Sequence, residues 1–485
     1  MRNLPKLHPL RRAWDAWHEG QADQAFGHYQ RALDSMPEDA ESLQALGYLA
    51  IEMEDNFNAL FTLGQAVQLD PDSPQSQLLH GVALRRKGDL AAAATAFENA
   101  ACLKPGWIDA INNLAVTLEE LDRHTEARYW LQHGLKDAPD DSDLLNQLGS
   151  VLCATGHPSE AAQAFHKALG REPDFIPAQF NLAQALMQSG DYESGWRLFD
   201  SRLELQEGIT PPQTQATIWK GEPLKERSIL VWHEQGFGDT LQFVRYLTLL
   251  VAREAKVVLR VPRELHRLLT ASLREVEVIS ETAPLPRTDF HTPLLSLPQY
   301  FWSETQFTSD VPYLAPLHCS EVRLPPRGKR LRIGLVWAGN PRHPNDARRT
   351  LPWETLAPLL NQQDYEWVLL QIGLDADTQG NHAFLRPSRL PGDFLDSASL
   401  LHEVDLLLTV DTAFAHLAGA MGCPVWMMIP FSADWRWQTG TAETPWYPSM
   451  RLFRQPHSGD WPAVLESVSH ALAEYSYRHN NLIAA

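Results

Sequence analysis

The sequence predicts an α-helical solenoid of short repeats followed by two α/β domains with doubly wound parallel sheets, and three observations support this. A 34-residue period runs through the first part of the 485-residue chain. After Leu205 the period stops, and short apolar runs alternate with helical stretches. A second alternation of this kind begins after the turn-rich segment LPPRGKR, which ends at Arg330. A fixed period near 34 is typical of stacked two-helix units, and strands that alternate with helices indicate parallel sheets.

The period is marked by prolines, at Pro37, Pro71, Pro105, Pro139 and Pro173. Proline cannot continue a helix but tolerates its first turn, so each proline is predicted to follow one repeat and open the next. Small residues recur where two helices should cross closely, in two phases: Ala32, Ala66, Ala100, Gly134 and Ala168, and Ala25, Ala59, Ala93, Ala127, Ala161 and Gly195. Large apolar residues recur where they can fill the space between repeats: Tyr29, Leu63, Phe97, Leu131, Phe165 and Phe199. A fourth phase holds Gly20, Gly88, Gly156 and Gly190, with Glu54 and Asp122 at its other two positions.

This pattern resembles the tetratricopeptide repeat over residues 3–206, as six repeats. The resemblance implies a solenoid whose concave surface binds a protein partner, since each repeat buries its core only against its neighbours.

Composition limits the classes of function. The net charge is −19, and residues 1–206 hold 16 Lys and Arg against 30 Asp and Glu, a balance of −14. Such a surface is unsuited to nucleic acid, which needs clustered cations; the acidity serves either solubility or the steering of a basic partner. The four cysteines are scattered, which predicts reduced thiols. Without an apolar signal region or an apolar run of about 18 residues, the chain is expected to be cytoplasmic.

The remaining sequence divides into a linker and two α/β domains. Residues 207–227 are rich in turn formers and predict the linker; the domains are predicted at 228–325 and 326–485. Strands are predicted at 228–233, 256–261, 276–280, 331–338, 367–372, 405–410 and 425–429, and helices at 239–254, 353–360, 398–404 and 412–421. In open α/β sheets the ligand lies at the carboxyl ends of the strands, so residues there are candidates for a site.

The first candidate is HEQGFGDTLQF, residues 233–243. A strand ends, Gly236 and Gly238 form a turn, and a helix begins at Asp239. Glycine lets a ligand approach the backbone, and a helix N-terminus favours an anion. The alternative is that Asp239 only caps its helix.

The second candidate is TVDTAFAHLAGAMGCPVWMMIP, residues 409–430. Asp411 and Thr412 follow a buried strand and open a helix rich in small residues. His416 lies one turn past Thr412 on the same face. The N-terminal amides of this helix could hold a diphosphate; alternatively, His416 is a structural residue.

Two more segments carry cations. AGNPRHPNDARRTLPW, residues 338–353, follows a strand and contains Asn340, Arg342, His343, Arg348 and Arg349. Paired arginines match phosphate oxygens well.

In SADWRWQTG and TPWYP, residues 432–448, tryptophans including Trp435 flank Arg436. These rings suit stacking on a base or sugar, or belong to the core.

At these residues the chain resembles a known enzyme family. GFGDTLQF resembles the glycine–aspartate motif of the heptosyltransferases (glycosyltransferase family nine), and VDTAFAHLAGA their nucleotide-sugar motif. The whole chain looks like bacterial proteins that fuse tetratricopeptide repeats to such a GT-B glycosyltransferase, some of which act on flagellins. The layout is similar to that of O-linked N-acetylglucosamine transferase.

The resemblance implies roles for individual residues. Asp239 would be the general base. The donor would be bound by Gly238, Asn340, Arg348, Arg349, Asp411, Thr412, Ala413 and His416, with Gln235, Arg342, Trp435 and Arg436 as further donor or acceptor contacts. Arg349 stands where the heptosyltransferases place a phosphate-binding lysine. Ala413 departs from the family's usual glycine, and the family's acidic donor contact would be Asp375 or Asp377.

The resemblance implies inverting transfer of a sugar from a nucleotide sugar to a flagellin-like protein, without metal or cofactor. The sequence shows no metal-ligand spacing of His and Cys. Two alternatives remain: a non-catalytic adaptor with a decayed or sensing GT-B part, and a transferase acting on lipopolysaccharide or another glycan. The absence of a basic membrane-binding patch disfavours the lipopolysaccharide acceptor.

Overall fold

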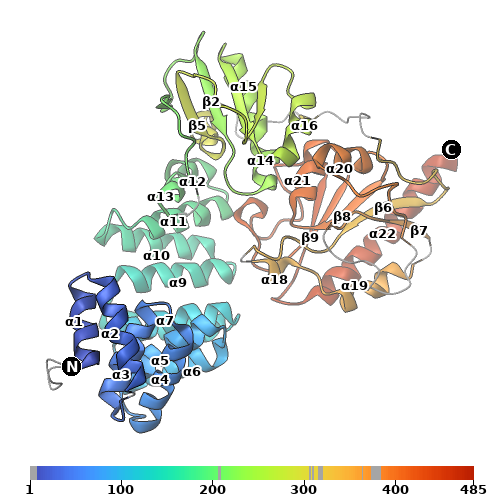
Figure 1. The fold of residues 1–485 in the computed structure, drawn as a ribbon. Coiled ribbons are helices and arrows are strands. Elements are labelled where there is room, and N and C mark those ends of the chain that lie inside the picture. The colour runs from blue at the N-terminus through green and yellow to red at the C-terminus, as the bar shows by residue number, and fades with distance from the viewer. Residues whose placement is uncertain are drawn as a thin grey trace. The chain divides into compact units, whose positions relative to one another are not determined.

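The computed structural model describes residues 8–35, 37–205, 209–304, 307, 311–314, 321–343, 345–362, 364–372 and 384–484. These form two compact units, Met1–Asn181 and Leu182–Ala485. Unit 1 is entirely helical where it is described, and unit 2 contains two parallel β-sheets (Figure 1).

Unit 1 consists of helices packed in consecutive pairs, α1 with α2, α3 with α4, α5 with α6, α7 with α8 and α9 with α10. Its helices are α1 (Pro9–His18), α2 (Ala22–Asp34), α3 (Ala40–Glu52), α4 (Asn56–Leu69), α5 (Pro74–Lys87), α6 (Leu90–Leu103), α7 (Ile108–Glu120), α8 (His124–Asp137), α9 (Ser142–Ala154) and α10 (Pro158–Arg171). Helix α11 (Ile176–Gln188) runs from unit 1 into unit 2. The predicted two-helix repeats are therefore confirmed.

The periodic prolines lie in the turns between repeats, and not in the first helical turn as the sequence suggested. Pro71 precedes the start of α5 by three residues, and Pro173 precedes the start of α11 by the same distance. The carbonyl oxygen of Pro71 accepts a hydrogen bond from Nε2 of Gln77 (3.0 Å), and that of Pro173 from the equivalent Gln179 (2.7 Å). The proline position is thus a repeated turn that the following helix holds through a side-chain amide.

The other four phases also have a structural meaning. The small and large apolar phases are buried throughout, from Ala25 and Tyr29 to Phe165. The fourth phase occupies the turn within each repeat, where all six residues, including Glu54 and Asp122, have a positive φ between 57° and 96°. Glycine adopts this conformation without the Cβ clash that other residues meet, which explains the recurrence of glycine there.

The first sheet of unit 2 has the order β1-β5-β2-β3-β4, with every pairing parallel. Its strands are β1 (Thr217–Ile218), β2 (Ser228–Trp232), β3 (Lys256–Val261), β4 (Glu277–Ser280) and β5 (Phe290–Pro293). Its other elements are α14 (Phe237–Phe243), η1 (Val244–Tyr246), α15 (Leu247–Ala252), α16 (Arg263–Ser272), η2 (Leu294–Ser296) and α17 (Leu297–Phe301). Strand β1 lies in the predicted linker, so this segment contributes an edge strand as well as the buried Trp219.

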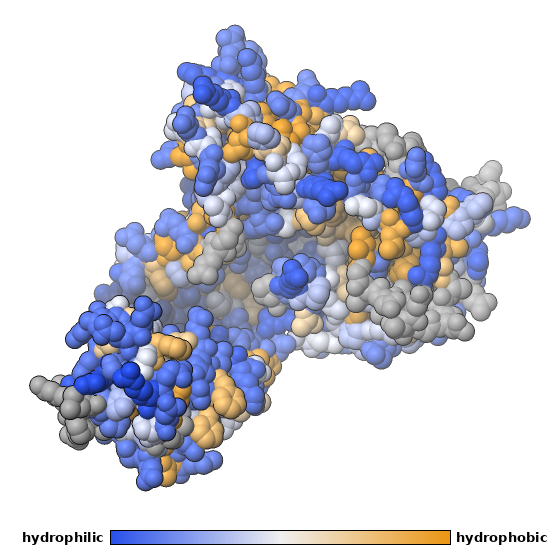
Figure 2. Space-filling model, in the orientation of Figure 1, coloured by the Kyte–Doolittle hydropathy of each residue, from blue (hydrophilic) through white to orange (hydrophobic). Residues whose placement is uncertain are grey.

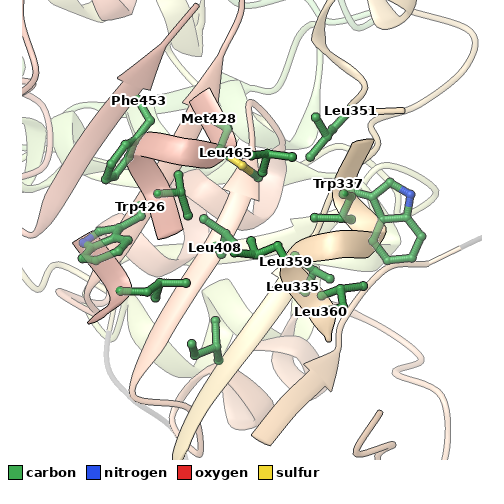
Figure 3. Packing of buried hydrophobic residues seen from close by; sticks show 14 of the residues in the cluster. Leu335, Trp337, Leu351, Leu359, Leu360, Leu408, Trp426, Met428, Phe453 and Leu465 are labelled. Atoms are coloured by element: carbon green, nitrogen blue, oxygen red, sulfur yellow. The ribbon is translucent and has the colours of Figure 1, made fainter. Parts of the chain in front are cut away.

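The second sheet has the order β10-β9-β8-β6-β7 and is also parallel. Its strands are β6 (Leu331–Val336), β7 (Tyr365–Leu369), β8 (Leu406–Val410), β9 (Val425–Ile429) and β10 (Met450–Arg454). The helices here are α18 (Asp346–Arg349), α19 (Trp353–Leu360), α20 (Phe394–Leu401), α21 (Ala413–Ala420), η4 (Trp435–Trp437) and α22 (Trp461–Ala484). Figure 3 shows Leu335, Leu408 and Met428 of the strands packed with Leu359 and Leu465 of the flanking helices. The predicted α/β class is confirmed.

Two short helices after α11, α12 (Tyr192–Phe199) and α13 (Arg202–Leu205), pack within unit 2. Trp196 of α12 is fully buried and lies edge-on to Phe243 and Trp435. The guanidinium of Arg202 forms two hydrogen bonds with the Glu234 carboxylate, at 2.9 and 2.6 Å, and both side chains are fully buried. The last helices of the solenoid are therefore part of the α/β unit's core.

On the face seen in Figure 2, hydrophilic residues predominate over the N-terminal repeats and hydrophobic ones form small separate patches. Among the described residues, no helix combines the length and the hydrophobicity that a membrane span requires. Cys102, Cys153 and Cys423 are free thiols, and Cys319 lies outside the described residues.

Candidate functional site

The two strongest sequence motifs meet where α14 packs against α21. Helix α14 follows the carboxyl end of β2, and α21 follows the carboxyl end of β8 (Figure 1). Gly238 of α14 lies directly on the imidazole of His416 of α21, so that a Cβ at position 238 would lie 2.7 Å from Cδ2 of the ring. The glycine of the first motif thus permits this helix contact.

Asp239 has two partners at this junction. Its Oδ2 accepts a hydrogen bond from the backbone N–H of Gly236 (2.9 Å), which caps α14. Its Oδ1 accepts one from Nη2 of Arg436 (2.5 Å). The carboxylate therefore both caps its helix and forms an ion pair with a residue of η4, while 19% of the side chain stays exposed.

Arg436 is held along its whole guanidinium. Besides Asp239, it donates from Nε to Oε1 of Gln242 (2.6 Å) and from Nη1 to Oδ1 of Asp434 (2.9 Å), and it stacks on the ring of Trp435 at 4.3 Å. Burial lowers the pKa of Arg436, but the nearby carboxylates of Asp434 and Asp239 raise it by a larger amount, so the net shift of this pKa is upward. Arg436 is thus a buried, permanent cation between the two α/β lobes of unit 2, which are the parts built around the first and the second sheet.

Asp411 and His416 lie beside this cation, at the end of β8. Burial raises the pKa of Asp411 to about 6, and repulsion from Asp434 adds to this, although its Oδ2 accepts a hydrogen bond from Nε1 of Trp437 (2.8 Å). Burial, and then the charge of Arg436, lower the pKa of His416 well below its ordinary value. His416 is therefore neutral near pH 7, with Nδ1 2.9 Å from the Tyr447 hydroxyl and Nε2 4.0 Å from Oδ1 of Asp411.

One arginine of the loop after β6 reaches the same place. Nη1 of Arg349 donates to the backbone carbonyl of Asp411 (3.1 Å), and its Nε donates to Oδ1 of Asp346 (3.1 Å). The pKa of His343 is lowered by burial and by Arg349, while Asp346, Asp434 and Asp239 oppose the shift. His343 is therefore within electrostatic range of Asp239 and of Arg349.

The other predicted contacts differ in position. Asn340 and Arg342 are exposed and joined to each other, since the Arg342 N–H donates to Oδ1 of Asn340 (3.1 Å). Gln235 is exposed with a φ of 59°. Trp435 is 5% exposed and packs edge-on against Trp196 of α12. It is therefore a core residue, which was the alternative to stacking on a base or sugar.

Arg348 is half-buried in α18, Thr412 has its hydroxyl 3.2 Å from that of Thr409, and Ala413 begins α21. The acidic candidates Asp375 and Asp377 lie outside the described residues.

Sequence reasoning missed Arg245, a second buried cation between the lobes. Its Nη2 donates to the Tyr313 hydroxyl (3.0 Å) and its Nη1 to the carbonyl of Trp446 (3.1 Å), and the guanidinium lies over the rings of Tyr313 and Tyr447. A charge inside the apolar stretch FVRYLTLL was the only signal for it. Within the described residues, no group of three His, Cys, Asp or Glu side chains is placed to hold a metal ion.

Comparisons with known proteins identify the repeats. The tetratricopeptide repeat family matches residues 45–107, 84–148 and 152–203, so the N-terminal region consists of tetratricopeptide repeats. The chain is similar to Protein FlbA of Caulobacter vibrioides, at 26% identity over 458 residues, covering 79% of this chain and 76% of FlbA. This similarity is longer than the repeat region and therefore extends into the α/β part.

Further relatives match over less than half of their own length. They include BBSome complex member BBS4 of Bos taurus (27% identity, 39% of this chain, 36% of BBS4) and the peroxisomal targeting signal receptor of Kluyveromyces lactis (23%, 39% and 40%). Solved structures include MamA of Desulfovibrio magneticus RS-1 (20% identity, TM-score 0.32, 36% of this chain and 99% of that one). Another is YrrB, described as a TPR protein with an unusual peptide-binding site (21%, TM-score 0.31, 37% and 93%).

Proposed function

We propose that this chain is a glycosyltransferase with a GT-B fold, which moves a sugar from a nucleotide-sugar donor to a hydroxyl of a protein recruited by the tetratricopeptide repeats. The position of Asp239 carries the proposal. Its carboxylate lies at the junction of α14 and α21, beside one buried cation and near the strand end that Arg349 contacts. A base and cations at the carboxyl ends of parallel strands are what direct displacement at a diphosphate-activated sugar requires.

In the proposed reaction, the acceptor oxygen forms a bond to the anomeric carbon while the bond from that carbon to the donor phosphate oxygen breaks. The acceptor proton passes to Asp239, and the bonding electrons leave with the nucleoside diphosphate. Attack opposite the leaving group inverts the anomeric configuration. Arg349 and Arg436 stabilise the charge that develops on the diphosphate.

Donor binding is the first test. The full-length chain is screened by thermal shift against UDP-, GDP- and ADP-linked sugars, the donors whose leaving group is a nucleoside diphosphate. A ligand at about 100 times its dissociation constant stabilises the folded state by about 2.7 kcal/mol. We expect one nucleotide class to shift both the wild type and Asp239→Asn, since the asparagine oxygen can still accept the Gly236 N–H. If none of the three classes binds, the proposal is wrong.

Transfer is the second test. The wild type is incubated with the selected donor and protein from the same cells, and a mass increase of one sugar residue is sought by intact-mass spectrometry. Asp239→Asn should add no sugar although it binds the donor. Equal modification by wild type and variant would exclude Asp239 as the base.

A second function, that of a non-catalytic adaptor, is favoured by a specific observation. Both oxygens of Asp239 already accept hydrogen bonds, and several relatives are named as a receptor or as members of complexes. Donor binding by the wild type without any modified protein would support the adaptor, since only the enzyme forms a product.

A further inference from the structure

The contact between Asp239 and Arg436 bears on the proposed role of Asp239, because it occupies one lone pair of Oδ1. A general base must direct a free oxygen lone pair at the acceptor proton. Oδ1 of Asp239 accepts a hydrogen bond from Nη2 of Arg436 at 2.5 Å, and Oδ2 accepts one from the Gly236 amide at 2.9 Å, so each oxygen uses one of its two lone pairs within the protein.

Charge explains why the cation stays on Asp239. Arg436 is almost fully buried, and a buried cation without anionic partners is costly. Asp239 and Asp434 supply those partners, and Asp411 also attracts it. A diphosphate that binds beside Asp411 would offer Arg436 a stronger acceptor, because guanidinium pairs with phosphate oxygens in a bidentate manner.

We propose that Arg436 exchanges partners during the reaction: it holds Asp239 while the donor is absent, and passes Nη2 to the donor diphosphate when the donor binds. The exchange takes the guanidinium away from Oδ1 of Asp239 and leaves both lone pairs of this oxygen available to the acceptor hydroxyl, so donor binding precedes base catalysis. Arg436 then acts as a catalytic residue on the leaving group. This inference rests on the proposed function and adds an order of events to it.

The exchange predicts how the affinity for a diphosphate depends on Asp239 and Arg436. Asp239 and the diphosphate compete for one guanidinium, so removal of the carboxylate charge must strengthen diphosphate binding. The gain must also depend on Arg436, since without the guanidinium there is nothing to compete for. A double-mutant cycle separates this coupling from general electrostatics.

The experiment measures the affinity of the full-length chain for UDP, GDP and ADP by calorimetry in four forms: wild type, Asp239→Asn, Arg436→Gln and the double variant. We expect Asp239→Asn to tighten binding of the preferred diphosphate about fivefold or more, and Arg436→Gln to weaken it about tenfold or more, in line with strong charge-assisted hydrogen bonds. In the Arg436→Gln background, Asp239→Asn should change affinity by less than about twofold. Arg436→Lys keeps the charge but not the fork, and serves if the glutamine variant does not fold; in that background the gain should also be reduced.

An equal gain in both backgrounds would mean that Asp239 acts only by through-space repulsion, and the exchange would be wrong although the proposed function would stand. Unchanged binding in Asp239→Asn would likewise overturn it. If the wild type binds none of the three diphosphates, the proposed function and the exchange both fail.

Discussion

Gly238 and His416 approach each other so closely that a Cβ on Gly238 would lie 2.7 Å from Cδ2 of the imidazole. This contact sets the spacing of α14 and α21 and therefore the position of Asp239. Because His416 is itself held by the Tyr447 hydroxyl, the ring cannot move without breaking that hydrogen bond.

Gly238→Ala should therefore destabilise unit 2 by about 1–3 kcal/mol, the usual cost of overpacking a well-packed contact. Urea unfolding measures the change. Gly392→Ala is the control, since its Cβ would meet Asp396 at an ordinary 3.5 Å. Similar free energies of unfolding for the two variants would show that the Gly238 contact can relax.

The turn within each repeat gives a second prediction. Gly88 and Glu54 occupy equivalent positions with φ values of 88° and 57°. Since a residue with a Cβ pays about 1–2 kcal/mol in this conformation, Gly88→Ala should destabilise unit 1 and Glu54→Gly should stabilise it by about 1 kcal/mol. Thermal unfolding of the two variants should show shifts of opposite sign, and shifts of the same sign would contradict the strain.

Asp411 predicts a pH dependence of stability. Its pKa is raised from 3.8 to about 6 in the folded chain, mainly by burial. Between these values the folded state holds a proton that the unfolded state has released, so the free energy of unfolding falls as pH rises from about 4 to 6. Above this window the ionised carboxylate costs roughly 2–3 kcal/mol.

Asp411→Asn removes that cost while its side-chain oxygen can still accept from Trp437. Urea unfolding should find the variant more stable than the wild type at pH 8, and equal to it near pH 4. A stability difference that does not change with pH would mean that Asp411 titrates normally.

The buried ion pair between Arg202 and Glu234 gives a fourth prediction. Burial raises the pKa of Glu234 despite the attraction of Arg202, so an unpaired carboxylate here would be poorly solvated. Arg202→Met should cost about 3–5 kcal/mol, since it strands one buried charge. Arg197→Met, which breaks the exposed pair with Glu193, should cost less than about 1 kcal/mol. Comparable losses in chemical denaturation would contradict a fully desolvated pair.

Periodicity predicted the repeats well because each structural role returns to the same position. The proline phase corresponds to the turn between repeats, and the small and large phases correspond to buried positions on the helices. The glycine phase corresponds to a left-handed turn within each repeat. The run of β-branched and apolar residues Val257, Val258 and Leu259 also predicted β3, and the continuous apolar run of β9 predicted that strand, both with the bounds that the structure shows. Strands β5 (FHTP) and β10 (MRLFR) were missed because polar residues interrupt them, and β1 because it has only two residues.

The site was only partly predictable, because its central contacts join distant segments. Strand ends and glycine turns indicated Asp239 and Asp411 separately, since local sequence encodes a turn. The hydrogen bond from Arg436 to Asp239 spans 197 residues, and the one from Arg245 to Trp446 spans 201. No local pattern encodes such pairs; they follow from the packing of the two lobes.

The packing of α12 and α13 within unit 2 makes the last prediction, on truncation. A chain that starts at Asp174 keeps α11 to α13, whereas one that starts at Glu207 loses the buried Trp196 and the Arg202 partner of Glu234. The longer piece should unfold cooperatively and bind the same nucleotide class as the full chain. The shorter piece should lose at least about 3–5 kcal/mol from each of these deletions, and should therefore aggregate or melt at a much lower temperature. Equal melting temperatures for the two pieces would show that unit 2 does not depend on these helices. If the longer piece binds donor but no longer modifies the protein acceptor, the remaining repeats recruit that acceptor; full modification would assign recruitment to unit 2.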